Sequence, residues 1–217
     1  MVLLDRHDRY GAVSIVLHWA LAASMLLAWL FGQLGDPRGA RELFQLHNSF
    51  GLLALVFALA LVIWRLFVPR PEPLVKSPLE RILARTVQAG LLAVAIAAPL
   101  SGIVALQSEG RPVRFFGIEV LSGNAPSARW LDGATRVLPT PAHADEDRQE
   151  EEHAYAGGYR EEGEAGEAAE ELHELLVVPL FLLLLGLHVA GVAKHHLIDR
   201  VPVLRRMLGR PALPAAG

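Results

Sequence analysis

The sequence predicts an all-α membrane protein, a transmembrane four-helix bundle with both termini in the cytoplasm. The chain of 217 residues is 53% hydrophobic and has a mean hydropathy of +0.34. It contains four apolar runs of about 19 to 22 residues without Asp, Glu, Lys or Arg, and basic residues gather beside particular ends of those runs. A helix of about 20 apolar residues crosses a hydrocarbon layer of about 30 Å. Each run is therefore long enough to span a bilayer.

A single membrane domain is expected over residues 1–217. Its spans are predicted at about 13–33, 43–67, 83–107 and 172–195. The N-terminal segment MVLLDRHDRYG is charged and no small-residue cleavage site follows the first run, so we expect the first span to remain in the mature protein. The protein is therefore predicted to cross a membrane several times.

Lys and Arg close to span ends predict the orientation, because they favour the cytoplasmic side. They gather in the connector between the second and third spans and in the C-terminal tail: Arg65, Arg70, Lys76, Arg81, Arg85, Lys194, Arg200, Arg205, Arg206 and Arg210. Both segments are therefore expected inside, and the third connector outside.

The connector 108–171 is expected to be extracytoplasmic. From residue 109 to 171 it holds 15 acidic and 6 basic side chains. The net charge of −3 for the whole chain does not reveal this excess of acidic residues, because the rest of the chain is basic. Phe115, Phe116 and Trp130 could lie on the membrane surface. The acidic, Gly- and Ala-rich part 141–168 is expected to be flexible.

The chain has no Cys, which excludes disulfides, thiolate metal sites and covalent c-type haem. Histidine remains as the main strong metal ligand. His18 lies near the cytoplasmic end of the first span and His188 at the matching depth of the fourth, while His47 and His173 share the outer level. Ionisable groups at membrane depth are costly and usually functional. Two histidine pairs from different helices predict two sites that hold b-type haem, with hydrogen-bonded structural histidines as the alternative.

The other histidines give weaker signals. His7 is expected at the surface, and His143 and His153 lie in the acidic connector, where solvation is favoured over loose metal binding. His195 and His196 follow Lys194 at the inner membrane edge. His195 could contact a haem propionate or a quinone headgroup, or could simply reach to the surface.

Several segments resemble the bacterial cytochrome b561 family. They are RYGAVSIVLHWAL around His18, QLHNSFGLLALVFALALVIWRL around His47, IAAPLSGIVAL in the third span, and ELHELL with GLHVAGVAKHHLIDRVPVLRRML in the fourth. The resemblance covers all four spans and is least in the acidic segment.

The resemblance implies a di-haem b-type cytochrome of the inner membrane. Its axial ligands would be His18 with His188 on the inner side and His47 with His173 on the outer side. The cofactors would be two haem b, with quinone as substrate. Arg65 and the outer arginines are candidates for propionate or anion contacts, with ordinary anchoring at the membrane edge as an equally favoured alternative; the outer ones are Arg38, Arg41, Arg111 and Arg114. The fourth-span histidines are one residue further apart than the family pattern, with Pro179 between them, so a bulge or kink is expected there.

The predicted function is electron transfer between the quinone pool and an extracytoplasmic or membrane redox partner, which makes the protein an oxidoreductase acting with quinone. The outer donor could be superoxide or another small molecule, or a basic carrier protein that suits the acidic connector. Membrane lipid and a possible homodimer complete the expected partners, and no nucleic acid is expected. Two alternatives stay open: a non-catalytic haem-bearing anchor subunit that wires a soluble dehydrogenase or hydrogenase to quinone, and a metal transporter, which the lack of intramembrane carboxylates disfavours.

Overall fold

The computed structural model describes residues 3–6, 9–35, 40–69, 71–72, 77–123, 164–201 and 203–209. Within this part of the chain, four helical segments are long and apolar enough to cross a membrane. The described residues are thus mostly helical, with a small β hairpin besides the helices. The predicted fold class, built on four membrane-spanning helices, is confirmed.

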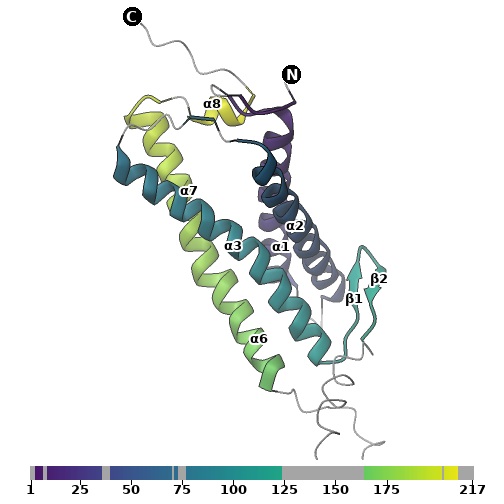
Figure 1. The fold of residues 1–217 in the computed structure, drawn as a ribbon. Coiled ribbons are helices and arrows are strands. Elements are labelled where there is room, and N and C mark those ends of the chain that lie inside the picture. The colour runs from purple at the N-terminus through teal and green to yellow at the C-terminus, as the bar shows by residue number, and fades with distance from the viewer. Residues whose placement is uncertain are drawn as a thin grey trace, which may run out of the picture.

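The first three spans are α1 (Ala12–Leu34), α2 (Arg41–Phe67) and α3 (Pro78–Ser108). They alternate in direction, and α1 packs chiefly along α2. Helix α3 starts five residues before the expected span, because Pro78 at the first helical turn suits the missing N–H of proline. We call the end of the bundle that holds the N-terminal residues the terminal end, and the opposite end the hairpin end (Figure 1).

The fourth span is one helical rod built from four pieces. It comprises α6 (Glu164–Leu175), the π-helix η1 (Leu176–Phe181), α7 (Leu182–Ala193) and a second π-helix, η2 (Lys194–Ile198). The backbone keeps right-handed helical angles across the junctions. The rod runs beside α3 from the hairpin end to the terminal end (Figure 1).

The start of α6 differs from expectation. The helix begins at Glu164, so the last residues of the segment 141–168, predicted to be flexible, are helical. Ala and Glu, which dominate this stretch, are strong helix formers. The rest of the acidic segment, together with His143, His153 and Trp130, lies outside the described residues.

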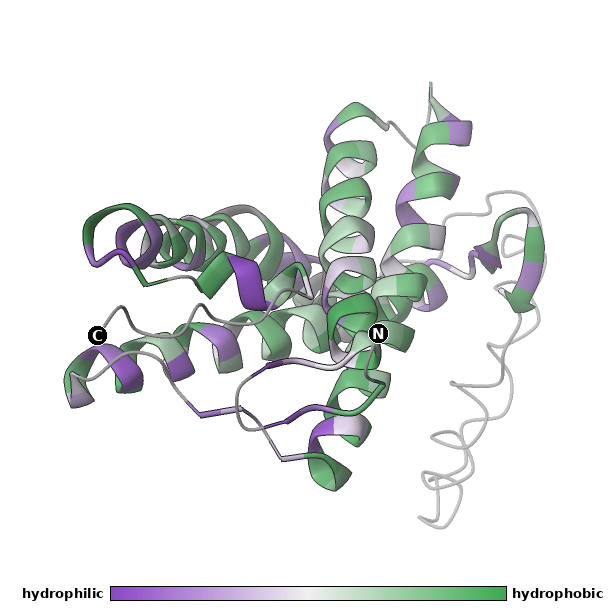
Figure 2. Cartoon of the chain, turned by 90° about the horizontal axis from the view of Figure 1, so that it is seen from above, coloured by the Kyte–Doolittle hydropathy of each residue, from purple (hydrophilic) through white to green (hydrophobic). Residues whose placement is uncertain are grey.

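Small side chains fill the buried positions between the spans, while large apolar side chains face outward. The buried small residues include Ser14, Ser24, Ala28, Ser49, Ala54, Ala58, Ala95, Ala98 and Ser101. Outward-facing examples are Val56, Ile63, Leu183, Leu187 and Val189. Small residues let helix backbones approach closely in membranes, and an apolar outer surface suits lipid. Figure 2 shows hydrophobic colouring along most of the spans.

A two-stranded antiparallel hairpin follows α3. Its strands β1 (Val113–Phe115) and β2 (Ile118–Leu121) are joined by Phe116 and Gly117, which have positive φ angles of 46° and 88°. Two successive residues with positive φ are typical of a tight two-residue hairpin turn. The Phe116 amide donates to Ser49 Oγ of α2 at 2.9 Å, which fixes the hairpin against the bundle.

A short helix, α8 (Val203–Met207), closes the terminal end. The indole nitrogen of Trp19 in α1 donates to the Met207 carbonyl oxygen at 3.0 Å. Arg206, which is buried, donates to the Glu72 carbonyl oxygen at 2.6 Å. The tail after the fourth span therefore folds back over α1 and the α2–α3 connection.

Candidate functional site

The first histidine pair lies near the terminal end. His18 of α1 and His188 of α7 face each other with ring centroids 6.3 Å apart and ring planes at 53°. Trp19, the next residue along α1, places its ring edge-on to His18 at 5.4 Å. The two imidazoles, expected at one depth from the sequence, therefore lie side by side in the structure.

The second pair lies near the hairpin end. His47 of α2 and His173 of α6 have ring centroids 5.9 Å apart and nearly perpendicular planes, at 86°. Phe44, one turn before His47, stacks against its ring at 5.9 Å. Four histidines from three spans therefore meet as two pairs, one towards each end of the bundle.

The separation within each pair suits a shared metal. Two collinear metal–imidazole bonds of about 2 Å, each continued by about 1 Å to the ring centre, put the centroids roughly 6 Å apart. The measured separations, 6.3 and 5.9 Å, match this distance. Direct histidine–histidine hydrogen bonding does not account for them, because no such bond joins either pair among the described residues.

Backbone carbonyls orient both imidazoles of the hairpin-end pair. The Nδ1 of His47 donates to the Ala28 carbonyl oxygen at 2.8 Å, and the Nδ1 of His173 donates to the Ala98 carbonyl oxygen at 2.7 Å. Ser101 Oγ also lies 3.3 Å from the His173 Nδ1. With Nδ1 occupied as a donor, Nε2 of each ring keeps its lone pair. This is the tautomer that a metal-ligating histidine takes when its other nitrogen is held by a carbonyl.

A glycine stands one turn beyond each of these carbonyls and makes room for the ring. A Cβ at Gly32 would lie 2.7 Å from the His47 Nδ1, and a Cβ at Gly102 would lie 3.2 Å from the His173 Cε1. Helices α1 and α3 thus share one arrangement: an alanine carbonyl accepts from the imidazole, and a glycine four residues later leaves space for the ring. The third span, which contributes no histidine of its own, positions His173 in this way.

A hollow beside the hairpin-end pair encloses about 630 Å³ of space not filled by atoms, part of it open to the outside. Both histidines line it, together with Gly51, Val113 and mostly apolar side chains of α1, α2, α3 and the fourth span. Trp29 also lines this hollow, and its indole nitrogen is buried without a hydrogen-bond partner. The mostly apolar lining with two imidazoles suits a mainly apolar group that takes imidazole ligands.

The π-helix η1 accounts for the long spacing in the fourth span. It contains Pro179, which has no N–H to donate to the preceding turn. A π turn accommodates one more residue than an α turn. The fifteen-residue interval between His173 and His188 is thereby absorbed, and both rings reach their partners. The expected bulge at Pro179 is present.

The two further candidates for cofactor contact, Arg65 and His195, both have carboxylate partners at the terminal end. Arg65 NH1 donates to Asp5 Oδ2 at 2.5 Å. His195 Nδ1 donates to Asp199 Oδ2 at 2.7 Å, and His196 is exposed. Neither candidate therefore presents an uncompensated charge to its surroundings.

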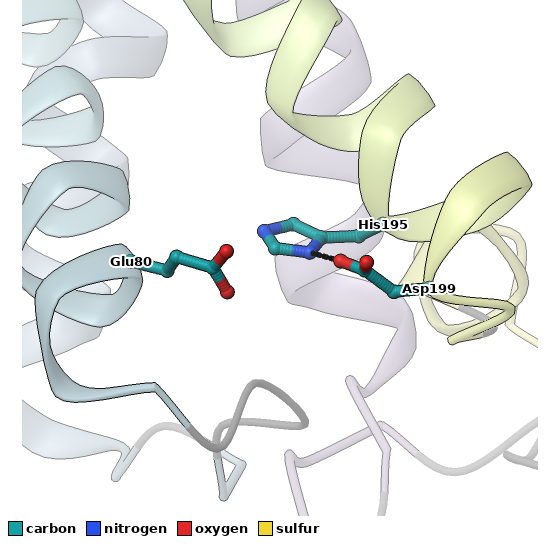
Figure 3. Close-up of side chains that lie close together, drawn as sticks. All are labelled: Glu80, His195 and Asp199. Atoms are coloured by element: carbon teal, nitrogen blue, oxygen red, sulfur yellow. Dashed lines mark hydrogen bonds and ion pairs between the residues drawn. The ribbon is translucent and has the colours of Figure 1, made fainter.

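A compact polar cluster surrounds His195. Lys194 Nζ contacts Glu80 of α3 and Asp199, each at 2.8 Å. Figure 3 shows Glu80 facing His195 and Asp199 from across the gap between α3 and the fourth span. Hydrogen bonds from Lys194, and next from His195, hold the pKa of Asp199 below its ordinary value. Donors, acceptors and an imidazole thus meet where the fourth span ends.

Two of the outer arginines, Arg111 and Arg114, have local partners. Arg111 pairs with Glu109 at 2.8 Å and lies over the Phe44 ring, 5.0 Å from its centroid. Arg114 lies 3.8 Å from Glu119 across the hairpin, and Arg41 begins α2. Arg38 and His7 lie outside the described residues.

Four membrane-spanning helices that bring two pairs of imidazoles together define a membrane cytochrome of the b type. The comparisons agree with this class. Residues 9–210 match the family described as prokaryotic cytochrome b561. The chain is also 27% identical over 216 residues to cytochrome b561 homolog 2 of Escherichia coli (strain K12), covering 97% of this chain and 96% of that protein.

The chain belongs to the prokaryotic cytochrome b561 family. It is a multi-pass protein of the bacterial inner membrane that binds haem b and works in electron transfer. The residues present fit such a group, because the lining of the hollow is mostly apolar and its two imidazoles keep Nε2 available. Sequence reasoning missed the carbonyls that orient the rings. The signal for them was the repeated Ala-x-x-x-Gly spacing in AWLFG and APLSG.

Proposed function

We propose that this cytochrome carries electrons through the membrane by way of two haem b groups, linking the quinone pool to a redox partner on the outer side. His18 and His188 would hold one haem, and His47 and His173 the other. The observation that carries the proposal is the convergence of four histidines into two pairs with centroids about 6 Å apart. When bound, the haem iron supplies a one-electron carrier.

The chain's own residues orient these ligands and keep water away. The Ala28 and Ala98 carbonyls hold their imidazoles by Nδ1, which raises the basicity of the ligating nitrogen. Val113 of the hairpin, only 2% exposed, lines the hollow from the hairpin end. A dry, apolar surrounding of this kind is a main factor in setting a redox potential.

The terminal end is proposed to face the cytoplasm. Arg65, Lys194, Arg205 and Arg206 lie at this end, and basic residues near span ends favour the cytoplasmic side. Both chain termini would then be cytoplasmic. The His18 and His188 pair would be the inner site, and the hairpin end would face outward.

The quinone headgroup is proposed to bind at the inner membrane edge, beside His195. Quinone chemistry moves protons together with electrons, and His195 forms a hydrogen-bonded unit with Asp199, Lys194 and Glu80. An imidazole that a carboxylate holds in place can act as a proton donor or acceptor for a bound group. This arrangement supports a role for His195 in headgroup binding and proton exchange.

The outer redox partner is proposed to deliver electrons at the hairpin end. Arg111 covers one face of Phe44, and Phe44 stacks on His47, so a continuous stack leads from a partly exposed cation to a proposed ligand. A small anion such as superoxide could be drawn to Arg111 locally, while a basic carrier protein would suit the acidic connector. Reduction assays with superoxide and with a basic cytochrome distinguish these donors.

The ligand assignment is tested by Ala substitution at each of the four histidines, with difference spectra and redox titration of the purified variants. His18→Ala and His188→Ala should remove the same haem, and His47→Ala and His173→Ala should remove the other. His196→Ala, at an exposed histidine of the same chain, should leave both. Loss of different haems within a proposed pair would overturn the assignment.

A further inference from the structure

The N-terminal segment before α1 is held against the first two spans by the buried carboxylate of Asp5. We call the hydrogen-bonded group of Asp5, Gly11, Ser14 and Arg65 the latch. The side chain of Asp5 is 0% exposed. It accepts hydrogen bonds from the Gly11 amide at 2.7 Å and from Ser14 Oγ at 2.8 Å, and it pairs with Arg65 NH1 at 2.5 Å. Asp5 therefore joins the N-terminal segment, the first turn of α1 and the last turn of α2.

The same contacts hold the end of α2 in place. Trp64, the neighbour of Arg65, donates its indole N–H to Ser14 Oγ at 2.9 Å, while Ser14 donates to Asp5. The Arg65 guanidinium also lies over the Tyr10 ring, 5.4 Å from its centroid. Its side chain is only 15% exposed. The position and the charge of Arg65 are thus both set by residues that precede the first span.

The latch lies one helical turn from a proposed haem ligand. Ser14 and His18 are four residues apart on α1, which places them on the same helix face about 6 Å apart along the axis. Arg65 reaches this part of α1 through Asp5 and Ser14. An uncompensated Arg65 cation here, in surroundings of low dielectric constant, would act on the neighbouring site. With Asp5 in place, the pair is electrically neutral as a whole.

We propose that Asp5 is a positioning residue for the terminal-end haem site, because it fixes Arg65 and cancels its charge beside His18. The inference rests on the proposed ligation of that haem by His18 and His188. Reduction of haem iron adds one electron to the site, so a nearby positive charge favours the reduced form. Neutralising Asp5 should therefore raise the midpoint potential of this haem, and neutralising Arg65 should lower it.

The test is a redox titration of the full-length, haem-loaded protein in detergent or lipid nanodiscs. Asp5→Asn is expected to raise the potential of the haem that His18→Ala removes and to leave the other potential in place. Arg65→Gln should shift the first potential downward. The double variant Asp5→Asn/Arg65→Gln should return close to the wild-type value, because the two charges are removed together.

Two controls separate charge from structure. Ser14→Ala removes an uncharged member of the same latch, which donates to Asp5 and accepts from Trp64, and it should move the potential much less than Asp5→Asn. Glu109→Gln unbalances Arg111 at the hairpin end and should not affect the terminal-end haem. In the haem-free protein, Asp5→Ala should speed hydrogen exchange of the Gly11 amide, which reports the latch without any cofactor.

Unchanged potentials in Asp5→Asn, with both haems bound, would overturn the role of Asp5. A shift of equal size in Ser14→Ala would also overturn the electrostatic explanation, since that variant changes no charge. Failure of the ligand assignment looks different, because His18→Ala would then leave both haem signals intact whatever Asp5→Asn does.

Discussion

Replacing Gly32 by Ala should weaken the hairpin-end haem site selectively. The new Cβ would lie 2.7 Å from the His47 Nδ1 and 3.0 Å from its Cε1. These distances are shorter than non-bonded atoms accept, so the imidazole must shift. Its 2.8 Å hydrogen bond to the Ala28 carbonyl oxygen is then stretched or broken, and the proposed ligating nitrogen loses its orientation.

The expected effect falls on haem affinity more than on folding. A metal-bound histidine usually donates a hydrogen bond from its other ring nitrogen, and loss of that acceptor lowers metal affinity about 10- to 100-fold. Overpacking by one methyl group costs about 1 to 3 kcal/mol, and Ala regains up to about 1 kcal/mol over Gly within a helix. The helix bundle should therefore survive the substitution while the site binds haem about 10- to 100-fold more weakly.

Titration of haem into the haem-free protein, followed by absorbance, measures this effect. Gly102→Ala should weaken binding less than Gly32→Ala, because its Cβ would lie 3.2 Å from the nearest His173 atom. Gly186→Ala is the matched control: it is a helical glycine, exposed, with no atom within 4 Å of its Cβ. Wild-type affinity in Gly32→Ala, or an equal loss in Gly186→Ala, would refute the reasoning.

Three further results are expected. Gly51 lines the hollow with open space at its Cβ position, so Gly51→Leu should block the hairpin-end haem yet keep the helical circular dichroism of the haem-free protein; full haem binding would contradict this. His195→Ala should slow quinone-dependent oxidation of the reduced protein about 10-fold or more, while His196→Ala should leave the rate unchanged; equal rates would argue against headgroup binding at His195. Because the folded-state pKa of Asp199 is lowered, its ion pair with Lys194 stabilises the protein above the unfolded-state value of about 3.9 and is lost as the pH falls through the folded-state pKa. Thermal unfolding of wild type and Asp199→Asn should differ at pH 6 and converge once the pH falls below the folded-state pKa of Asp199; a difference that persists in acid would refute this.

The depth of each histidine followed from the sequence because helix rise converts residue number into position across the membrane. Connector lengths and alternating span direction then paired His18 with His188 and His47 with His173, and these pairs meet in the structure. The irregular turn in the fourth span could also be predicted, because the interval from His173 to His188 is one residue longer than the family pattern and Pro179 lacks the N–H that a regular turn needs.

The groups that orient the histidines were harder to predict. The acceptors for His47 and His173 are backbone carbonyls of Ala28 and Ala98, and backbone atoms leave no residue-specific trace in a sequence. Gly32 and Gly102 can be found in the sequence, because each follows its alanine by four residues. Their role in making room for a histidine ring cannot, because it depends on which helix packs opposite.

The latch of Asp5 on Arg65 shows a different limit. The two residues are sixty positions apart, and their contact depends on the N-terminal segment folding back over α1. Sequence alone offered Arg65 as a basic residue near a membrane edge, open to a haem propionate. The buried carboxylate that compensates it became apparent only when the three segments were brought together in space.

The number of haem b groups bound by each chain tests the central claim most directly. A reduced-minus-oxidised spectrum, with haem extracted and quantified against protein, should give two haem b per chain in the purified full-length protein. The same measurement should give one haem b per chain when either histidine of one pair is replaced by Ala. A single haem per wild-type chain, or two haems retained in both His47→Ala and His188→Ala, would contradict the account.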